Sequence, residues 1–301
     1  MLNRARELNE PAGQYPVQPL PATRQEDRST MHLDLIQSLS LAGNPDVAND
    51  DRIGSADLHA WVIDGATDLG PPGLLGQRGG AAWLAATAQR AFAGAEGSLE
   101  LVCESVFAQV ARDYERQRQR LPVATWELPR ASFAAVALEG DQLSCGFLGD
   151  CAVLHRSAQG IAFLTPEPDR QAESAEAAAL GPGTGAHGVR TPAIIADRRL
   201  ARERPKAVLS VDAQAARAAL RYTRTPVAAG DDLVLMSDGF SALLDSYAAF
   251  TPADFIAHLL HHGLADLALQ LRRIEKEDAA CLRYPRFKAS DDASAIWLRV
   301  S

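Results

Sequence analysis

Three short apolar stretches, far apart along the chain, each run directly into an aspartate. Apolar runs of this length are typical of buried strands and are shorter than most helices. The aspartates and the stretches before them are Asp64 after 61–63, Asp150 after 146–149 and Asp238 after 233–237. Because strand ends in a packed sandwich lie along its rim, we expect these carboxylates to meet at one edge of the fold.

Seven stretches have the length and apolar content of β-strands, and several others have helical periodicity. The predicted strands are 32–41, 58–63, 132–138, 143–148, 152–155, 233–236 and 293–300, with 132–155 forming a continuous meander. The predicted helices are 81–94, 98–119, 213–220, one after Gly239, one after Pro252, and 264–278. Paired strands before and after helical blocks favour an α+β layered sandwich over a doubly wound sheet.

Two segments depart from this regular pattern. Residues 1–30 hold four prolines among charged residues and too little apolar surface to offset the entropy of ordering, which predicts a flexible leader. We expect a single domain over 31–301. Within it, 165–192 is rich in proline and glycine, which predicts a long irregular insertion with one alanine-rich turn of helix.

Composition excludes several classes of function. The 30 basic residues against 38 acidic ones give a net charge of −8, which disfavours binding to nucleic acid or to anionic membranes. The four cysteines have no metal-site or disulfide spacing, so free thiols in a reducing compartment are expected. No apolar run approaches the roughly 20 residues that span a bilayer, and the polar N-terminus lacks a signal-peptide core, so we expect a cytoplasmic protein.

Further acidic residues flank the strands. Ser290-Asp291-Asp292 precedes the last strand, and Asn49-Asp50-Asp51 lies upstream of the strand that carries Asp64. Carboxylates that converge repel one another unless cations lie between them, and an all-oxygen ligand set favours Mg²⁺ or Mn²⁺. For any single aspartate, the simpler interpretation is that it starts a turn. The ordered set as a whole favours a metal site.

At this point the sequence resembles the metal-dependent protein phosphatases of type 2C, as a divergent member of bacterial type. The resemblance covers about residues 31–300 and depends on five motifs in a fixed order. These are Asn49-Asp50-Asp51-Arg52 (family Asn-Glu-Asp), Val62-Ile63-Asp64-Gly65 (Val-x-Asp-Gly), Leu148-Gly149-Asp150-Cys151 (Val-Gly-Asp-Ser), Gly230–Phe240 (Gly-Asp-x-hydrophobic-Ser-Asp-Gly) and Ser290–Ile296 (Asp-Asn-hydrophobic-Thr).

The resemblance implies a four-layer αββα sandwich, with two antiparallel sheets between layers of helices. It also implies an enzyme that hydrolyses phosphoserine or phosphothreonine in phosphorylated proteins. It implies two Mn²⁺ or Mg²⁺ ions and no protein nucleophile, since a metal-activated water attacks the phosphoryl group. The segment 165–192 corresponds to the family's flap beside the active site. The metal ligands implied are Asp50, Asp64, the carbonyl of Gly65, Asp238 and Asp291, with Asp150 for a third, weaker ion and Asp51 and Asp292 in support.

Two departures from the family pattern leave an alternative open. Where the family commonly has a phosphate-binding arginine, this chain has Asp46, and Arg52, Arg78, Arg170 or Arg190 would have to replace it. The segment after Asp64-Gly65 also lacks the histidine found in many members. A catalytically degenerate module that binds or regulates is therefore the alternative to an active phosphatase.

Overall fold

The computed structural model describes residues 31–76, 79–188 and 191–301, so the predicted leader lies outside the described residues. The strands are β1 (Leu33–Leu41), β2 (Arg52–Ser55), β3 (His59–Gly65), β4 (Arg130–Glu139), β5 (Gln142–Leu148), β6 (Ala152–Ser157), β7 (Gly160–Phe163), β8 (Leu209–Ser210), β9 (Arg221–Pro226), β10 (Asp232–Met236) and β11 (Ala293–Val300). The helices are α1 (Gly80–Ala93), α2 (Leu99–Gln117), α3 (Gln171–Ala179), α4 (Pro192–Glu203), α5 (Ala213–Ala219), α6 (Asp238–Ser241) and α7 (Pro252–Glu277), with 3₁₀ turns η1 (Thr125–Glu127) and η2 (Thr184–His187).

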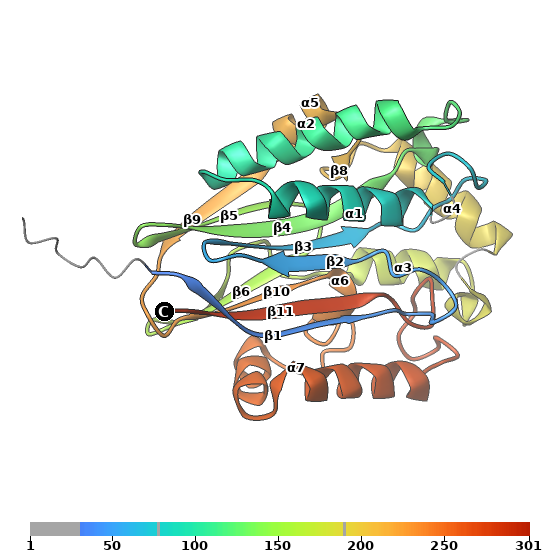
Figure 1. Cartoon of the computed structure of the whole chain (residues 1–301). Helices are drawn as coiled ribbons and strands as arrows, with labels where there is room; N and C mark the ends of the chain where they lie inside the picture. The colour runs from blue at the N-terminus through green and yellow to red at the C-terminus, as the bar shows by residue number, and fades with distance from the viewer. Residues whose placement is uncertain (1–30, 77–78, 189–190) are drawn as a thin grey trace, which may run out of the picture. The chain divides into compact units, whose positions relative to one another are not determined.

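Two antiparallel sheets face each other, and helices cover their outer faces (Figure 1). One sheet has the strand order β1-β11-β10-β6-β7, and the other has β2-β3-β4-β5-β9 with β8 beside β4. Helices α1 and α2 cover the second sheet, and α7 packs on the first (Figure 1). This is the predicted αββα sandwich. No helix in the described ranges combines the length and the apolar character that crossing a membrane requires.

Alternation along the strands builds three apolar layers. In β4, Phe133 packs with residues of α1 and α2, whereas its neighbour Ala134 faces the other sheet. In β10, Leu235 lies between the sheets and Val234 faces α7. Successive side chains of a strand point to opposite faces, so a strand covered on both sides is apolar throughout. This is why the central strands could be predicted from short, continuous apolar runs.

The strand predictions miss four strands and misplace one pairing. Strands β2, β7, β8 and β9 are short or largely exposed, so they lack the apolar runs that reveal buried strands. The predicted meander is wrong in its last pairing, because β6 pairs with β10 and β7 in the opposite sheet. Gly149, with φ 84°, gives the sharp turn after β5 from which the chain crosses between the sheets.

The insertion 165–192 is more helical than predicted. Helix α3 has nine residues, more than a single turn, and α4 begins at Pro192 just beyond the segment. Helix α4 was not predicted, although Thr191-Pro192 is a recognisable start signal, with proline at the first helical position.

Candidate metal centre

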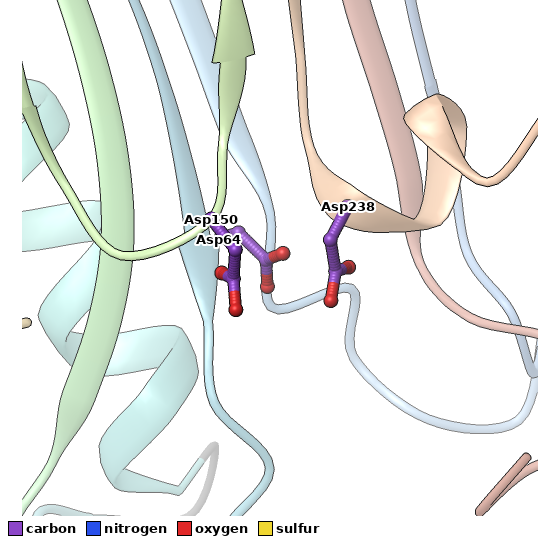
Figure 2. A group of neighbouring side chains, drawn as sticks. All are labelled: Asp64, Asp150 and Asp238. Atoms are coloured by element: carbon purple, nitrogen blue, oxygen red, sulfur yellow. The ribbon is translucent and has the colours of Figure 1, made fainter. Parts of the chain in front are cut away.

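Asp64, Asp150 and Asp238 come together at one edge of the sandwich. Each can place a carboxylate oxygen so that the three oxygens all lie within 4.8 Å of one another. Figure 2 shows Asp64 and Asp150 side by side, with Asp238 across the gap from them. We call these three residues the aspartate cluster. The predicted convergence of the three strand ends is thus present in the structure.

Strand register explains why segments so far apart meet here. Asp64 of β3 lies opposite Ser132 at the start of β4. In the other sheet, Met236 at the end of β10 lies opposite Ala295 near the start of β11. The end of β10 therefore delivers Asp238 at the same edge as the segment that precedes β11. One sheet supplies two acids of the aspartate cluster, and the other supplies the third.

Burial and mutual repulsion perturb two members of the aspartate cluster. Burial, followed by the charges of Asp238 and Asp51, raises the pKa of Asp64 well above its ordinary value. Burial raises the pKa of Asp238 to about 6, because the nearby Asp291 adds repulsion and Arg170 only partly offsets these effects. Such shifts mean that, without a divalent cation, the nearby positive charge does not fully compensate the burial and mutual repulsion of these carboxylates.

Asp150 is the most exposed member of the aspartate cluster and has its own partners. Ser132 donates a hydrogen bond of 2.5 Å from Oγ to Asp150 Oδ1, and Lys206 Nζ lies 3.1 Å from Oδ2. Burial alone would raise the pKa of Asp150, but Lys206 and the Ser132 hydroxyl outweigh it and lower the pKa. Asp150 is thus held ionised beside two neighbours that favour protonation.

Asp51 carries a buried carboxylate. Its two side-chain oxygens have no partner among the described residues, and only 2% of the residue is exposed. Burial raises the pKa of Asp51 to about 8, although the nearby hydroxyls of Ser237 and Ser294 act in the opposite direction. A buried acid without partners is costly, which is consistent with a carboxylate whose counter-ion is a cation.

The segment with Asp50 is fixed to the segment with Asp292. The carboxylate of Asp292 accepts hydrogen bonds from the backbone N–H groups of Gly43 (2.8 Å) and Asp50 (2.7 Å). Asp292 therefore positions the loop that carries Asp50. Burial and the charge of Asp292 raise the pKa of Asp50 to about 7. A side chain at Gly65 would lie 2.8 Å from the Asp50 carbonyl oxygen, so glycine allows this close approach.

Asp50 and the aspartate cluster line different cavities. A cavity of about 210 Å³ is lined by Asp64, Asp150, Asp238 and Asp291. Asp50 instead lines a neighbouring cavity of about 660 Å³, together with Asp292. The acids predicted as ligands of one centre are thus distributed over two adjoining cavities.

Basic side chains pair with the acids of the centre. Lys288 forms an ion pair with Asp291, and Arg170 Nη2 lies 3.5 Å from Asp238 Oδ2. Together with Lys206 at Asp150, each of these three acids has a cationic neighbour. The sequence analysis missed both lysines. For Lys206 no local signal exists, because its partner lies more than fifty residues away, whereas Lys288 stands close to the Asp291-Asp292 motif.

The arginines considered for substrate phosphate differ in their placement. Arg52 donates from Nη1 to the backbone carbonyls of Asn49 (2.7 Å) and Asp51 (2.5 Å), so it stabilises its own loop. Arg170 lines the 210 Å³ cavity. Arg78 and Arg190 lie outside the described residues.

The residues present fit a divalent cation with oxygen ligands. The aspartate cluster supplies hard anionic oxygens within 4.8 Å of one another. Asp51, whose charge acts on Asp64, adds two buried carboxylate oxygens that have no hydrogen-bond partner among the described residues. Neither cysteine sulfur nor histidine nitrogen belongs to this group of ligands. Such a set is suited to Mg²⁺ or Mn²⁺.

The raised pKa values predict that the metal-free protein loses stability as the pH rises. The pKa values of Asp238 (about 6), Asp50 (about 7) and Asp51 (about 8) exceed that of an unfolded aspartate. The folded state therefore binds more protons than the unfolded state across this range, and its stability is greatest at low pH. We expect the melting temperature in chelator to fall between pH 5.5 and pH 8, by roughly 6–12 °C if the net loss is on the order of 3 kcal/mol.

Acids with lowered pKa values, such as Glu127 and Asp278, do not affect this measurement, because they are ionised in both states throughout the window. Thermal unfolding followed by circular dichroism at both pH values provides the test. A melting temperature that rises from pH 5.5 to pH 8 in chelator would contradict this account of the site.

Comparison with known proteins gives a family and a fold. The family model described as Protein phosphatase 2C matches residues 46–272 of this chain. No curated protein sequence matches significantly.

Solved structures share the architecture at low sequence identity. The catalytic domain of the serine/threonine protein phosphatase PstP, crystallised with two manganese ions, aligns with a TM-score of 0.54 and 16% identity over 90% of this chain and 99% of that one. The PstP/Ppp phosphatase of Mycobacterium tuberculosis gives 0.53 and 15%, covering 90% and 98%. A serine/threonine phosphatase of S. agalactiae gives 0.51 and 16%, covering 90% and 100%. At these identities the likeness concerns the fold alone.

Proposed function

We infer the function from one premise, which is that this chain belongs to the protein phosphatase 2C family. We propose that it is a metal-dependent phosphatase that removes phosphate from phosphoserine or phosphothreonine in proteins. The observation that carries the proposal is the aspartate cluster, in which three strand ends from both sheets bring carboxylate oxygens within 4.8 Å of one another. A similar structure solved with two manganese ions supports the same type of chemistry.

In this proposal, Asp64, Asp238 and Asp291 hold one Mn²⁺ or Mg²⁺ ion. Asp64, the carbonyl of Gly65 and Asp50 hold a second ion, and Asp150 serves a third, weaker position. When bound, the ions supply a strong nucleophile at neutral pH and neutralise the charge that builds up on the phosphoryl group. Asp292 contributes indirectly, since it positions the loop of Asp50 through backbone hydrogen bonds.

Basic side chains beside the aspartate cluster supply the contacts to substrate phosphate in this proposal. Arg170 and Lys206 line the same cavity as the aspartate cluster and are its cationic neighbours. Asp46, at the place of the family's arginine, is exposed and acidic, so it cannot bind phosphate. We therefore assign phosphate binding to Arg170 and Lys206, because guanidinium and ammonium groups donate charge-assisted hydrogen bonds to phosphate oxygens.

No protein nucleophile is required. Cys151 adjoins Asp150 in sequence, but its thiol is buried, and burial together with the charges of Asp64 and Asp150 raises its pKa well above the ordinary value. A thiol in that state is a poor nucleophile. Ser132 donates its hydroxyl hydrogen to Asp150 and so helps to position that carboxylate.

Phosphate release tests the proposal directly. We expect the protein to hydrolyse a phosphothreonine peptide and an aryl phosphate with Mn²⁺ present, and to stop when a chelator is added. A phosphotyrosine peptide is the comparison substrate for side-chain preference. If neither the phosphothreonine peptide nor the aryl phosphate is hydrolysed with Mn²⁺ or Mg²⁺, the protein is not a phosphatase of this kind. The retained aspartates do not favour the alternative of a degenerate module, for which calorimetry would find metal binding without turnover.

A further inference from the structure

Lysine is rare in this chain and concentrated at the candidate metal centre. Only three of the 30 basic residues in the sequence are lysines, namely Lys206, Lys276 and Lys288. Two of the three form ion pairs with acids of the centre, Lys206 with Asp150 and Lys288 with Asp291. Apart from Lys276, arginine provides the basic side chains elsewhere in the chain, and within the centre Arg170 stands beside Asp238. The choice of lysine at these two positions therefore suggests a property that arginine lacks.

Lys288 lies where the two acidic cavities adjoin. It lines the 210 Å³ cavity that contains the aspartate cluster, and it also lines the 660 Å³ cavity that contains Asp50. The carboxylates that act on its ammonium group are, in order of strength, those of Asp291, Asp238 and Asp64. Its positive charge also acts on Asp50. One ammonium group thus stands among four of the acids to which we assign metal ligation.

The chemistry of lysine suits a counter-cation that can be displaced. Its ammonium group is a compact point charge on a flexible stem, whereas arginine would hold a carboxylate through a rigid, two-point fork. The Lys288 side chain is one-third exposed, so it has an outlet to solvent. A divalent ion brings twice the charge into the same group of carboxylates. We therefore expect the divalent ion and the Lys288 ammonium group to compete for the same carboxylates.

We propose that Lys288 is a built-in counter-cation of the metal centre, which neutralises Asp291 and its neighbours in the metal-free protein and must be displaced before a divalent ion can bind Asp291. The inference depends on the proposed function in one respect, that the metal binds at these acids. It adds that the centre fills at a higher metal concentration than its carboxylates alone would require. Lys288 thereby sets the range of metal concentration to which the protein responds.

Calorimetric titration with Mn²⁺ and with Mg²⁺ tests this proposal. We expect Lys288→Met, which removes the charge but retains the aliphatic stem, to bind Mn²⁺ about tenfold more tightly or better, comparable to the known effects of residues around metal ligands. Lys276→Met is the matched control, because Lys276 is exposed on α7, and its affinity should equal that of the wild type. Without metal, Lys288→Met should also melt at a lower temperature than the wild type at pH 8.

Unchanged or weaker Mn²⁺ affinity in Lys288→Met would overturn the proposal. Lys288→Gln, which keeps a polar head, guards against a folding artefact and should shift affinity in the same direction. Phosphate release measured on the same samples separates this inference from the proposed function. Metal binding without turnover defeats the phosphatase assignment alone, whereas turnover with equal affinities in wild type and variant defeats the role of Lys288 alone. If no protein binds metal, both are wrong.

Discussion

We expect Asp238→Asn to reduce metal-dependent phosphate release by more than about 100-fold, beyond the upper end of the losses seen when residues outside the ligand shell are changed. The substitution removes a negative charge at nearly constant volume from a member of the aspartate cluster. It also removes repulsion from Asp291, since that carboxylate contributes to the raised pKa of Asp238. The metal-free variant should therefore fold, and its affinity for Mn²⁺ should fall together with its turnover.

Turnover assays and calorimetry on the same preparation measure both effects. Asp141→Asn is a matched control, because Asp141 is exposed in the β4–β5 turn, at the opposite end of β5 from Asp150. That control should retain the activity and metal affinity of the wild type. Full activity in Asp238→Asn would show that Asp238 is not a metal ligand and that our assignment of the site is wrong.

Gly239→Ala should damage both the fold and the metal centre. A methyl group at Gly239 would overlap the backbone carbonyl oxygen of Asp292 and lie 3.0 Å from the Asp291 side chain. Backbone cannot rotate away as a flexible side chain can, so the segment before β11 has to move. We expect a destabilisation of about 3 kcal/mol, at the upper end of the usual cost of overpacking, and a lower affinity for Mn²⁺ as Asp291 moves away from Asp238.

Gly94→Ala provides the comparison for this prediction. Gly94 follows α1, and a methyl group there would meet its nearest neighbour, the Arg90 carbonyl oxygen, at an ordinary 3.6 Å. Its effect on stability should stay within about 0.5 kcal/mol. Thermal unfolding in chelator measures the first effect, and calorimetry measures the second. A Gly239→Ala protein as stable as Gly94→Ala would show that the start of α6 has more room than the structure indicates.

The regular part of the fold is predictable because its signals are local. Ser98 caps α2 through a hydrogen bond from the Leu101 N–H, as its position before an apolar stripe suggested. The buried strands β3, β4, β10 and β11 appear as apolar runs, since both of their faces are covered. Strand β9 lacks such a run because it is an exposed edge, and its conformation depends on pairing with β5. Short-range patterns report burial, and they do not report pairing at a polar edge.

The candidate site divides in the same way. The aspartates at the strand ends could be selected from the sequence because each follows a buried apolar run. The sequence could not reveal that Asp292 holds backbone N–H groups of the Asp50 loop. Nor could it show that the buried carboxylate of Asp51 has no hydrogen-bond partner among the described residues, or that lysines pair with Asp150 and Asp291.

By itself the sequence determined the layered architecture and the set of acids from which a metal centre can be built. Both follow from the order of apolar and polar residues over a few positions, which fixes the faces of each strand and the residue at its end. The tertiary structure alone decided which acids share a cavity and which cations stand beside them. That outcome depends on strand register and on contacts between segments far apart in the chain, and an electrostatic interaction is set by distance in space.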